Sequence, residues 1–176
     1  MKIGIFGGSF NPIHYGHIFL AKNIIQNKLV DELWFMVSPQ NPLKVPSDLA
    51  SDIQRLENVR HAISEIEGVR VSDFEFHQPR PSFMCDTLFK LQSLRKNDIF
   101  FLVIGADNWK CFDKWKNYEK ILEKFHIIIY PRKGYDVERK NLPSTVSYLD
   151  LPLCDISSTQ LRQMLKEGKD ISSYIP

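Results

Sequence analysis

Short apolar segments rich in β-branched residues alternate with helix-length amphipathic segments along the chain, and this alternation most constrains the fold. Such a pattern is typical of a parallel β-sheet whose strands are joined by helices. It predicts strands at residues 2–6, 33–37, 69–72, 99–104, 126–130 and 146–149. We therefore expect an α/β fold with a parallel sheet.

Helices are expected between these strands. Apolar residues fall on one helical face in two segments: Leu20, Ala21, Ile24 and Ile25, and then Leu56, Val59, Ala62, Ile63 and Ile66. Further helices are predicted at 83–94, 118–124 and 158–166, the last of which ends before Gly168. This order predicts a Rossmann-like, doubly wound parallel sheet of five to six strands with helices on both faces. The irregular segments 38–47 and 131–143 are expected at the rim of its ligand crevice.

Length and charge narrow the class of protein. The chain has 176 residues, 43% of them hydrophobic, which is enough for one core and predicts a single domain, 1–176. Lys and Arg number 23 against 21 Asp and Glu, so the net charge of +2 argues against a nucleic-acid partner. The longest apolar run, 99–104, is far shorter than the roughly 18 residues of a membrane span.

The N-terminus and the cysteines suggest where the protein works. The first ten residues lead directly into glycines with no apolar signal region, so we expect a cytoplasmic protein. Cys85, Cys111 and Cys154 are widely separated and form no C-x-x-C pair, which argues against a disulfide framework and a zinc site. The sequence leaves open whether the chain forms a homo-oligomer.

The strongest functional signal is the segment 7–17, Gly-Gly-Ser-Phe-Asn-Pro-Ile-His-Tyr-Gly-His, between the first strand and the first helix. Gly7 and Gly8 allow a sharp turn and a close approach of the backbone to a ligand, and the following helix N-terminus favours an anion. His14 and His17 lie three residues apart, so both imidazoles project to one side and can donate to phosphate oxygens. A glycine-rich turn with two surface histidines is the ordinary alternative, but the combination favours a phosphate site.

A second signal lies near the C-terminus, in Ile-Ser-Ser-Thr-Gln-Leu-Arg at 156–162. Ser157 with Gln160 fits a capping box, which by itself would only begin a helix. Successive hydroxyl residues at a helix start, with Arg162 one turn further on, can also form a binding site for a polyphosphate.

These two motifs resemble those of the nucleotidyltransferase superfamily, whose members carry an H-x-G-H or T-x-G-H loop and a late I-S-S-T-x-x-R helix. The Asn-Pro-Ile-His of residues 11–14 looks like that of the bacterial nicotinate-nucleotide adenylyltransferases. Phosphopantetheine adenylyltransferases usually have Asp-Pro followed by threonine instead. The segments 104–108 and 112–115 are similar to the family's G-A-D segment and its ring-stacking tryptophan. The resemblance covers nearly the whole chain.

The resemblance implies that the chain transfers AMP from ATP to nicotinate mononucleotide, giving deamido-NAD and pyrophosphate in NAD biosynthesis. It implies catalytic roles for His14, His17 and Arg162. The residues implied to bind ATP are Gly8, Ser9, Phe10, His17, Gly105, Asp107, Arg132, Ser158 and Arg162. Those implied to bind the mononucleotide are Lys44, Phe83, Met84, Asp86 and Trp115.

The chemistry of two of these residues fits such roles. Asp107, directly after a buried strand, is suited to accept hydrogen bonds from ribose hydroxyls, although an aspartate there can also cap a helix. Trp115 offers a flat face for a pyridine ring, although core packing is an equally ordinary use of tryptophan.

The chain departs from the family at two places. Leu43 stands where the family usually has a histidine, and Phe83-Met84 stands where it usually has Tyr-Thr. The segment around 82–86 helps the family to hold the pyridine carboxylate, partly through backbone amides. Backbone donors survive such substitutions and side-chain donors do not.

No residue pattern suggests a covalent nucleophile, so we expect direct attack of the mononucleotide phosphate on the α-phosphorus of ATP. Magnesium, Mg²⁺, should bind to the substrate phosphates and water, with no protein cage. The same chemistry on nicotinamide mononucleotide or another acceptor such as phosphopantetheine remains an alternative. A nucleotide-binding protein without catalysis is a further alternative, against which the intact His14, His17, Ser158 and Arg162 argue.

Overall fold

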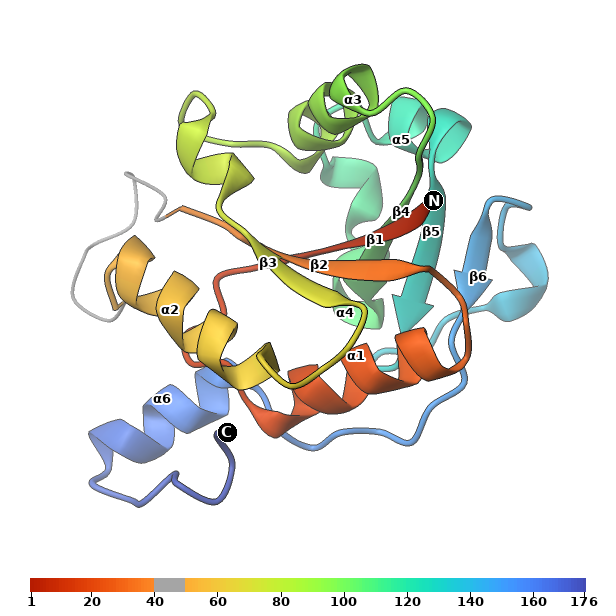
Figure 1. Ribbon diagram of the computed structural model, residues 1–176. Helices are drawn as coiled ribbons and strands as arrows, with labels where there is room; N and C mark the ends of the chain where they lie inside the picture. Colours follow the sequence, from red (N-terminus) through yellow and green to blue (C-terminus); the bar gives the residue numbers. More distant parts are fainter. Residues whose placement is uncertain (40–49) are drawn as a thin grey trace.

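A computed structural model describes residues 1–39 and 50–176 and contains a six-stranded parallel sheet in the order β3-β2-β1-β4-β5-β6 (Figure 1). The strands are β1 (Lys2–Gly8), β2 (Glu32–Val37), β3 (Val69–Ser72), β4 (Ile99–Gly105), β5 (His126–Tyr130) and β6 (Val146–Tyr148). All six predicted strands are confirmed. β1 and β4 extend beyond their predicted ends, into the glycines that follow their apolar residues.

Helices cover both faces of this sheet, as predicted. They are α1 (Tyr15–Gln26), α2 (Asp52–Ile63), α3 (Met84–Leu94), α4 (Ala106–Lys110), α5 (Tyr118–Lys124) and α6 (Ser158–Lys166). α1 and α2 lie against one face, and α3 and α5 lie against the other (Figure 1). α6 begins where the Ser157 hydroxyl accepts a hydrogen bond from the Gln160 N–H at 3.2 Å, and Gly168 follows its end with φ +71°.

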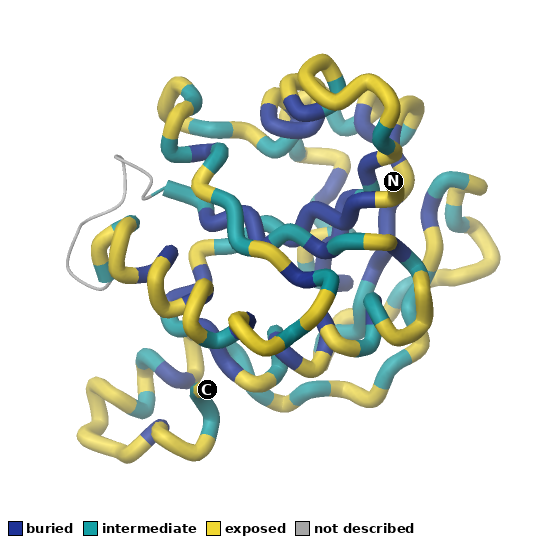
Figure 2. The backbone as a smooth tube through the Cα atoms, in the orientation of Figure 1, coloured by how far each residue is buried: buried dark blue, intermediate teal, exposed yellow. Residues whose placement is uncertain are grey.

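The core consists of two apolar layers, one on each face of the sheet, and the central strands are buried along most of their length (Figure 2). Because residues alternate between the faces along a strand, Phe6 joins the layer beneath α1 and α2, whereas Ile3 and Ile5 join the layer beneath α3 and α5. Burial on both faces explains why the strands read as continuous apolar runs.

The strand order creates a crevice at one place. β1 pairs with β2 on one side and with β4 on the other, so the chain connections diverge at the carboxyl ends of β1 and β4. Ligands of doubly wound sheets bind at such a point. Of the two irregular segments predicted at its rim, 131–143 follows the carboxyl end of β5 and contains a short 3-10 helix, η4 (Arg139–Asn141). Most of 38–47, including the predicted Lys44, lies outside the described residues.

No helix in the described ranges is long and apolar enough to span a membrane.

Candidate nucleotide-binding active site

The loop between β1 and α1, residues 9–14, lies at the crevice and is hereafter called the phosphate loop. Phe10 adopts a left-handed backbone conformation with φ +46°, which is uncommon for a residue other than glycine. Its side chain is buried against Phe6, with ring centroids 5.4 Å apart, and against His17 at 5.1 Å. The Phe10 ring therefore supports the loop from beneath and leaves only its backbone for contact with a ligand.

His14 and His17 form a stacked pair at the start of α1. Their ring centroids lie 3.7 Å apart with planes inclined at 25°. The His14 backbone N–H donates to His17 Nδ1 at 3.2 Å, so a neutral His17 carries its proton on Nε2. Both ring nitrogens of His14 are buried without a hydrogen-bond partner in the protein. Since buried polar atoms normally have partners, the pair is suited to a ligand that supplies oxygen acceptors.

Both imidazoles of this pair are neutral at pH 7. Burial, together with the positive charge of Arg132, lowers the pKa of His14 from 6.5 to about 4. Burial also lowers the pKa of His17 well below 6.5, with further contributions from His14 and Arg132. A neutral imidazole still donates one hydrogen bond. The fixed positive charge beside the pair is therefore the Arg132 guanidinium.

Arg132 is part of a small polar group at the carboxyl ends of β4 and β5. Its Nε lies 3.5 Å from Asp107 Oδ1, which is buried and makes no hydrogen bond. Gly105 makes room for this carboxylate, because a Cβ there would lie 2.2 Å from Asp107 Oδ1. Burial raises the pKa of the nearby Tyr130 to about 12, so its phenol remains protonated. Asp107 lies in the first turn of α4, of which Gly105 is the N-cap.

The two sequence motifs meet in space although 146 residues separate Pro12 from Ser158. The Ser158 hydroxyl donates to the Pro12 carbonyl at 2.9 Å, and Arg162 Nη1 donates to the Asn11 carbonyl at 2.8 Å. Both side chains thus hold the N-terminus of α6 against the phosphate loop. The predicted N-cap role of Ser157 is confirmed.

Two hollows adjoin at the start of α4, because Asp107 lines one and Asn108 lines the other. The α6 hollow is open to solvent, has a volume of about 760 Å³ and is lined by Asp107, Arg132, Lys133, Tyr135, Cys154, Asp155, Ile156, Ser157, Thr159 and Gln160. The α3 hollow is also open to solvent, has a volume of about 1030 Å³ and is lined by Gly7, Gly8, Ser38, Glu75, Ser82, Phe83, Met84, Cys85, Asn108, Lys114, Trp115 and Lys116. The crevice therefore offers two adjacent compartments.

The α3 hollow brings together Phe83, Met84 and Trp115, three of the residues predicted for the mononucleotide. Gly7 is close to Met84, since a Cβ on this glycine would lie 2.5 Å from Met84 Cε. Asp86 does not line this hollow. It lies on the neighbouring surface, where its Oδ2 accepts a hydrogen bond from Lys116 Nζ at 2.8 Å.

Sequence reasoning assigned no role to several side chains in this region. Lys116 lies at the edge of the α3 hollow, with its ammonium 4.6 Å from the centre of the Phe83 ring. Asn108 lines the same hollow, and Tyr130 lies beneath Arg132. Lys116 and Asn108 are sequence neighbours of Trp115 and Asp107, and this proximity was the signal that could have identified them.

No cluster of three or more His, Cys, Asp or Glu side chains that could hold a metal ion occurs in the ranges 1–39 and 50–176.

A parallel sheet in the order 3-2-1-4-5-6, with a paired-histidine loop and a serine-rich helix meeting at its switch point, defines a nucleotidyltransferase. Residues 5–164 match the family model described as cytidylyltransferase-like. A protein of Bacteroides thetaiotaomicron named "Probable nicotinate-nucleotide adenylyltransferase" is 47% identical over 99% of this chain and 87% of its own length. A Bacteroides fragilis protein of the same name is also 47% identical, with the same coverage. The chain belongs to the nicotinate-nucleotide adenylyltransferase family, within the cytidylyltransferase-like group.

The fold also matches a solved structure. The Plasmodium falciparum nicotinic acid mononucleotide adenylyltransferase complexed with NaAD has a TM-score of 0.85. It is 24% identical, and the match covers 99% of this chain and 90% of that chain. This likeness supports the Rossmann-like α/β fold.

Proposed function

We propose that this protein transfers AMP from ATP to nicotinate mononucleotide, releasing pyrophosphate and forming the deamido dinucleotide NaAD for NAD biosynthesis. The observation that carries the proposal is the stacked His14 and His17 pair, which lines one cavity together with Arg132, while Arg132 also lines the α6 hollow that adjoins the α3 hollow. Membership of the nicotinate-nucleotide adenylyltransferase family supplies the substrates. A structural relative named as complexed with NaAD supports the same product.

ATP is assigned to the α6 hollow and the phosphate loop. Asp107 would accept hydrogen bonds from ribose hydroxyls, for which its Oδ1, which is buried and makes no hydrogen bond within the protein, is suited. The backbone of Gly8, Ser9 and Phe10 would face the triphosphate. Arg132 and Arg162 contribute positive charge along the same path, and Arg162 is assigned to the leaving pyrophosphate.

Nicotinate mononucleotide is assigned to the α3 hollow. Trp115 is half-buried at its wall and offers a face on which the pyridine ring can stack. The backbone at Phe83 and Met84, which begins α3, would donate to the pyridine carboxylate, because the first N–H groups of a helix lack partners within it.

The transfer is an in-line displacement in which the mononucleotide phosphate attacks the α-phosphorus of ATP and the bond to pyrophosphate breaks. Negative charge develops on the phosphate oxygens, and preorganised donors stabilise it. His17 donates through Nε2–H, since its Nδ1 already accepts from the His14 backbone. His14 supplies a second neutral donor, and Arg132 supplies charge.

Mg²⁺ is expected to arrive with the ATP phosphates. The ion would be held mainly by substrate oxygens and water rather than by a protein cage. When bound, the ion neutralises charge on the phosphate oxygens.

The proposal is tested by incubating the protein with ATP, Mg²⁺ and one acceptor at a time, and measuring pyrophosphate release and the mass of the product. Nicotinate mononucleotide should give stoichiometric pyrophosphate and NaAD. Nicotinamide mononucleotide and phosphopantetheine are the comparison acceptors. The proposal is contradicted if pyrophosphate is released only when phosphopantetheine is the acceptor. It is also contradicted if none of the three acceptors gives pyrophosphate.

A further inference from the structure

An arginine on α2, Arg55, is buried almost completely although helix α2 lies at the molecular surface. Its residue exposure is 1%, whereas the other arginine of this helix, Arg60, is exposed. A buried charge is costly unless it is paired and hydrogen-bonded, so the partners of Arg55 reveal what the burial achieves.

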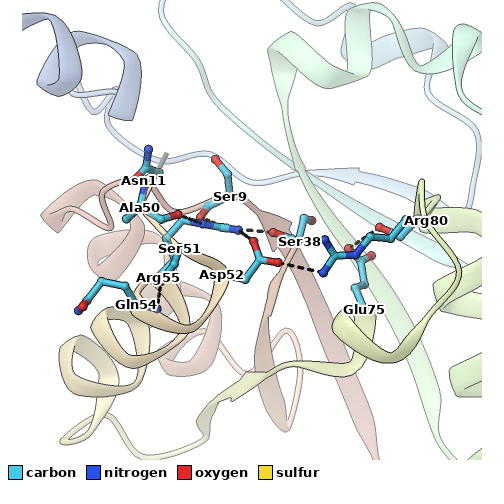
Figure 3. A network of polar contacts seen from close by, with 11 residues as sticks. Ser9, Asn11, Ser38, Ala50, Ser51, Asp52, Gln54, Arg55, Glu75 and Arg80 are labelled. Carbon is cyan, nitrogen blue, oxygen red and sulfur yellow. Dashed lines mark hydrogen bonds and ion pairs between the residues drawn. The ribbon is translucent and has the colours of Figure 1, made fainter. Parts of the chain in front are cut away.

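The partners of Arg55 come from separate parts of the chain (Figure 3). Nη1 donates to the Ser9 carbonyl at 2.6 Å and to the Ser38 carbonyl at 2.9 Å, and Nε donates to the Ala50 carbonyl at 3.2 Å. Nη2 donates to Asp52 Oδ1 at 2.6 Å. One guanidinium thereby joins the phosphate loop, the end of β2 and the start of α2.

The bond to Ser9 acts on the peptide unit between Ser9 and Phe10. In a planar trans peptide the carbonyl and the following N–H point in opposite directions. Arg55 holds the Ser9 carbonyl toward α2, so the Phe10 N–H is directed away from α2. Phe10 has φ +46°, a conformation of higher energy that persists only where its surroundings impose it. A charge-assisted hydrogen bond on the adjoining carbonyl is such a restraint.

The charge of Arg55 is balanced by an aspartate that also pairs with a second arginine. Asp52 Oδ2 lies 3.0 Å from Arg80 Nη2. The Arg80 side chain is 42% exposed and pairs with Asp52 rather than with the phosphate loop. Arg80 is therefore a suitable control for Arg55, because both arginines pair with Asp52 and Arg55 also bonds the Ser9 carbonyl.

We propose that Arg55 is a positioning residue for ATP, which acts through the Ser9 carbonyl to orient the Phe10 N–H toward the triphosphate. The inference rests on the proposed function, because that function assigns the triphosphate to this backbone. Arg55 touches no substrate. Its contribution is to hold the phosphate loop in its binding conformation before ATP arrives, so its loss should weaken ATP binding selectively.

Arg55→Lys tests this proposal, because lysine keeps the charge but cannot reach the same carbonyls with a planar, forked group. A hydrogen bond to a charged group contributes enough for its loss to raise the KM and Kd for ATP by about 10-fold or more. The KM for nicotinate mononucleotide should change less than that for ATP, because Arg55 bonds the Ser38 carbonyl at the wall of the α3 hollow and not Trp115, Phe83 or Met84, which are assigned to the ring. ATP binding is measured by calorimetry without acceptor, alongside steady-state kinetics.

Two matched variants separate positioning from stability. Val59→Ala truncates a buried side chain on the same helix, and Arg80→Gln removes the second ion pair to Asp52. Both should keep the wild-type Kd for ATP even where the Tm falls. If Arg55→Lys does not fold, Arg55→Gln serves in the same comparison. Unchanged ATP binding in the Arg55 variant, or equal weakening in Val59→Ala at a similar loss of Tm, overturns the proposal. Because calorimetry needs no turnover, this result stands apart from failure of the wild type to form NaAD.

Discussion

Lowering the pH should destabilise this protein through the stacked histidine pair. His14 has a pKa of about 4 in the folded protein against an ordinary 6.5, chiefly because of burial. The unfolded chain therefore binds a proton at this residue as pH falls below 6.5, while the native protein does not until near pH 4. The stability that the neutral His14 contributes is present above pH 6.5 and is lost as pH falls through 4.

The magnitude follows from the two pKa values. At about 1.4 kcal/mol per pH unit, moving from pH 7 to pH 4.5 should cost about 2.5 kcal/mol of unfolding free energy through His14 alone. The lowered pKa of His17 adds to the loss in the same direction. Carboxylates also titrate in this range. The quantity to compare is therefore the pH dependence of the unfolding free energy of the wild type minus that of His14→Gln.

Urea unfolding followed by circular dichroism at pH 7, 6, 5 and 4.5 gives this difference, and NMR titration of the imidazole Cε1–H gives the pKa directly. Arg132→Gln should raise the pKa of His14, because the Arg132 charge is the second cause of its lowering. Lys133→Gln is the matched control, since Lys133 is exposed and pairs with Asp155 at 2.9 Å. A His14 pKa near 6.5, or an equal pH dependence in wild type and His14→Gln, would refute the reasoning.

Three substitutions test the assigned roles around the crevice. His17→Ala should lower kcat by about 10²-fold or more through loss of a phosphate donor, while the exposed His61→Ala should match wild type in kcat and Tm. Arg162→Ala should raise the KM for ATP far more than that for the mononucleotide; the opposite pattern would mean that the two compartments are assigned in reverse. Trp115→Ala should lower kcat/KM with acid and amide acceptors alike, since stacking does not read the carboxylate; a changed acid-to-amide ratio would argue against this role.

The central strands could be predicted from the sequence because they are buried on both faces and therefore read as apolar runs. β5 and α6 were predicted to the residue, since a continuous run such as Ile127–Ile129 and a serine N-cap with a glycine stop are local signals. α4 was not predicted as a helix, because five residues are too few to show a 3.6-residue period.

Contacts between distant residues could not be predicted in this way. The Ser158 hydroxyl looked available for phosphate, but in the structure it donates to Pro12, 146 residues away. Nothing in the sequence indicated that Arg55 is buried, because one of its partners is the Ser9 carbonyl, 46 residues away. Asp86, predicted for the mononucleotide, pairs with Lys116 on the surface next to the α3 hollow. Only the fold determines which segments meet, and local patterns do not contain that information.

The acceptor specificity of the wild-type protein tests the central claim most directly. If backbone amides near Phe83 and Met84 bind the pyridine carboxylate, the acid gains a charge-assisted hydrogen bond that a carboxamide lacks. With Mg²⁺ and saturating ATP, kcat/KM for nicotinate mononucleotide should exceed that for nicotinamide mononucleotide by at least about 10²-fold, or roughly 2.7 kcal/mol in the transition state. Equal values for the two acceptors would contradict the assignment of nicotinate mononucleotide as the substrate.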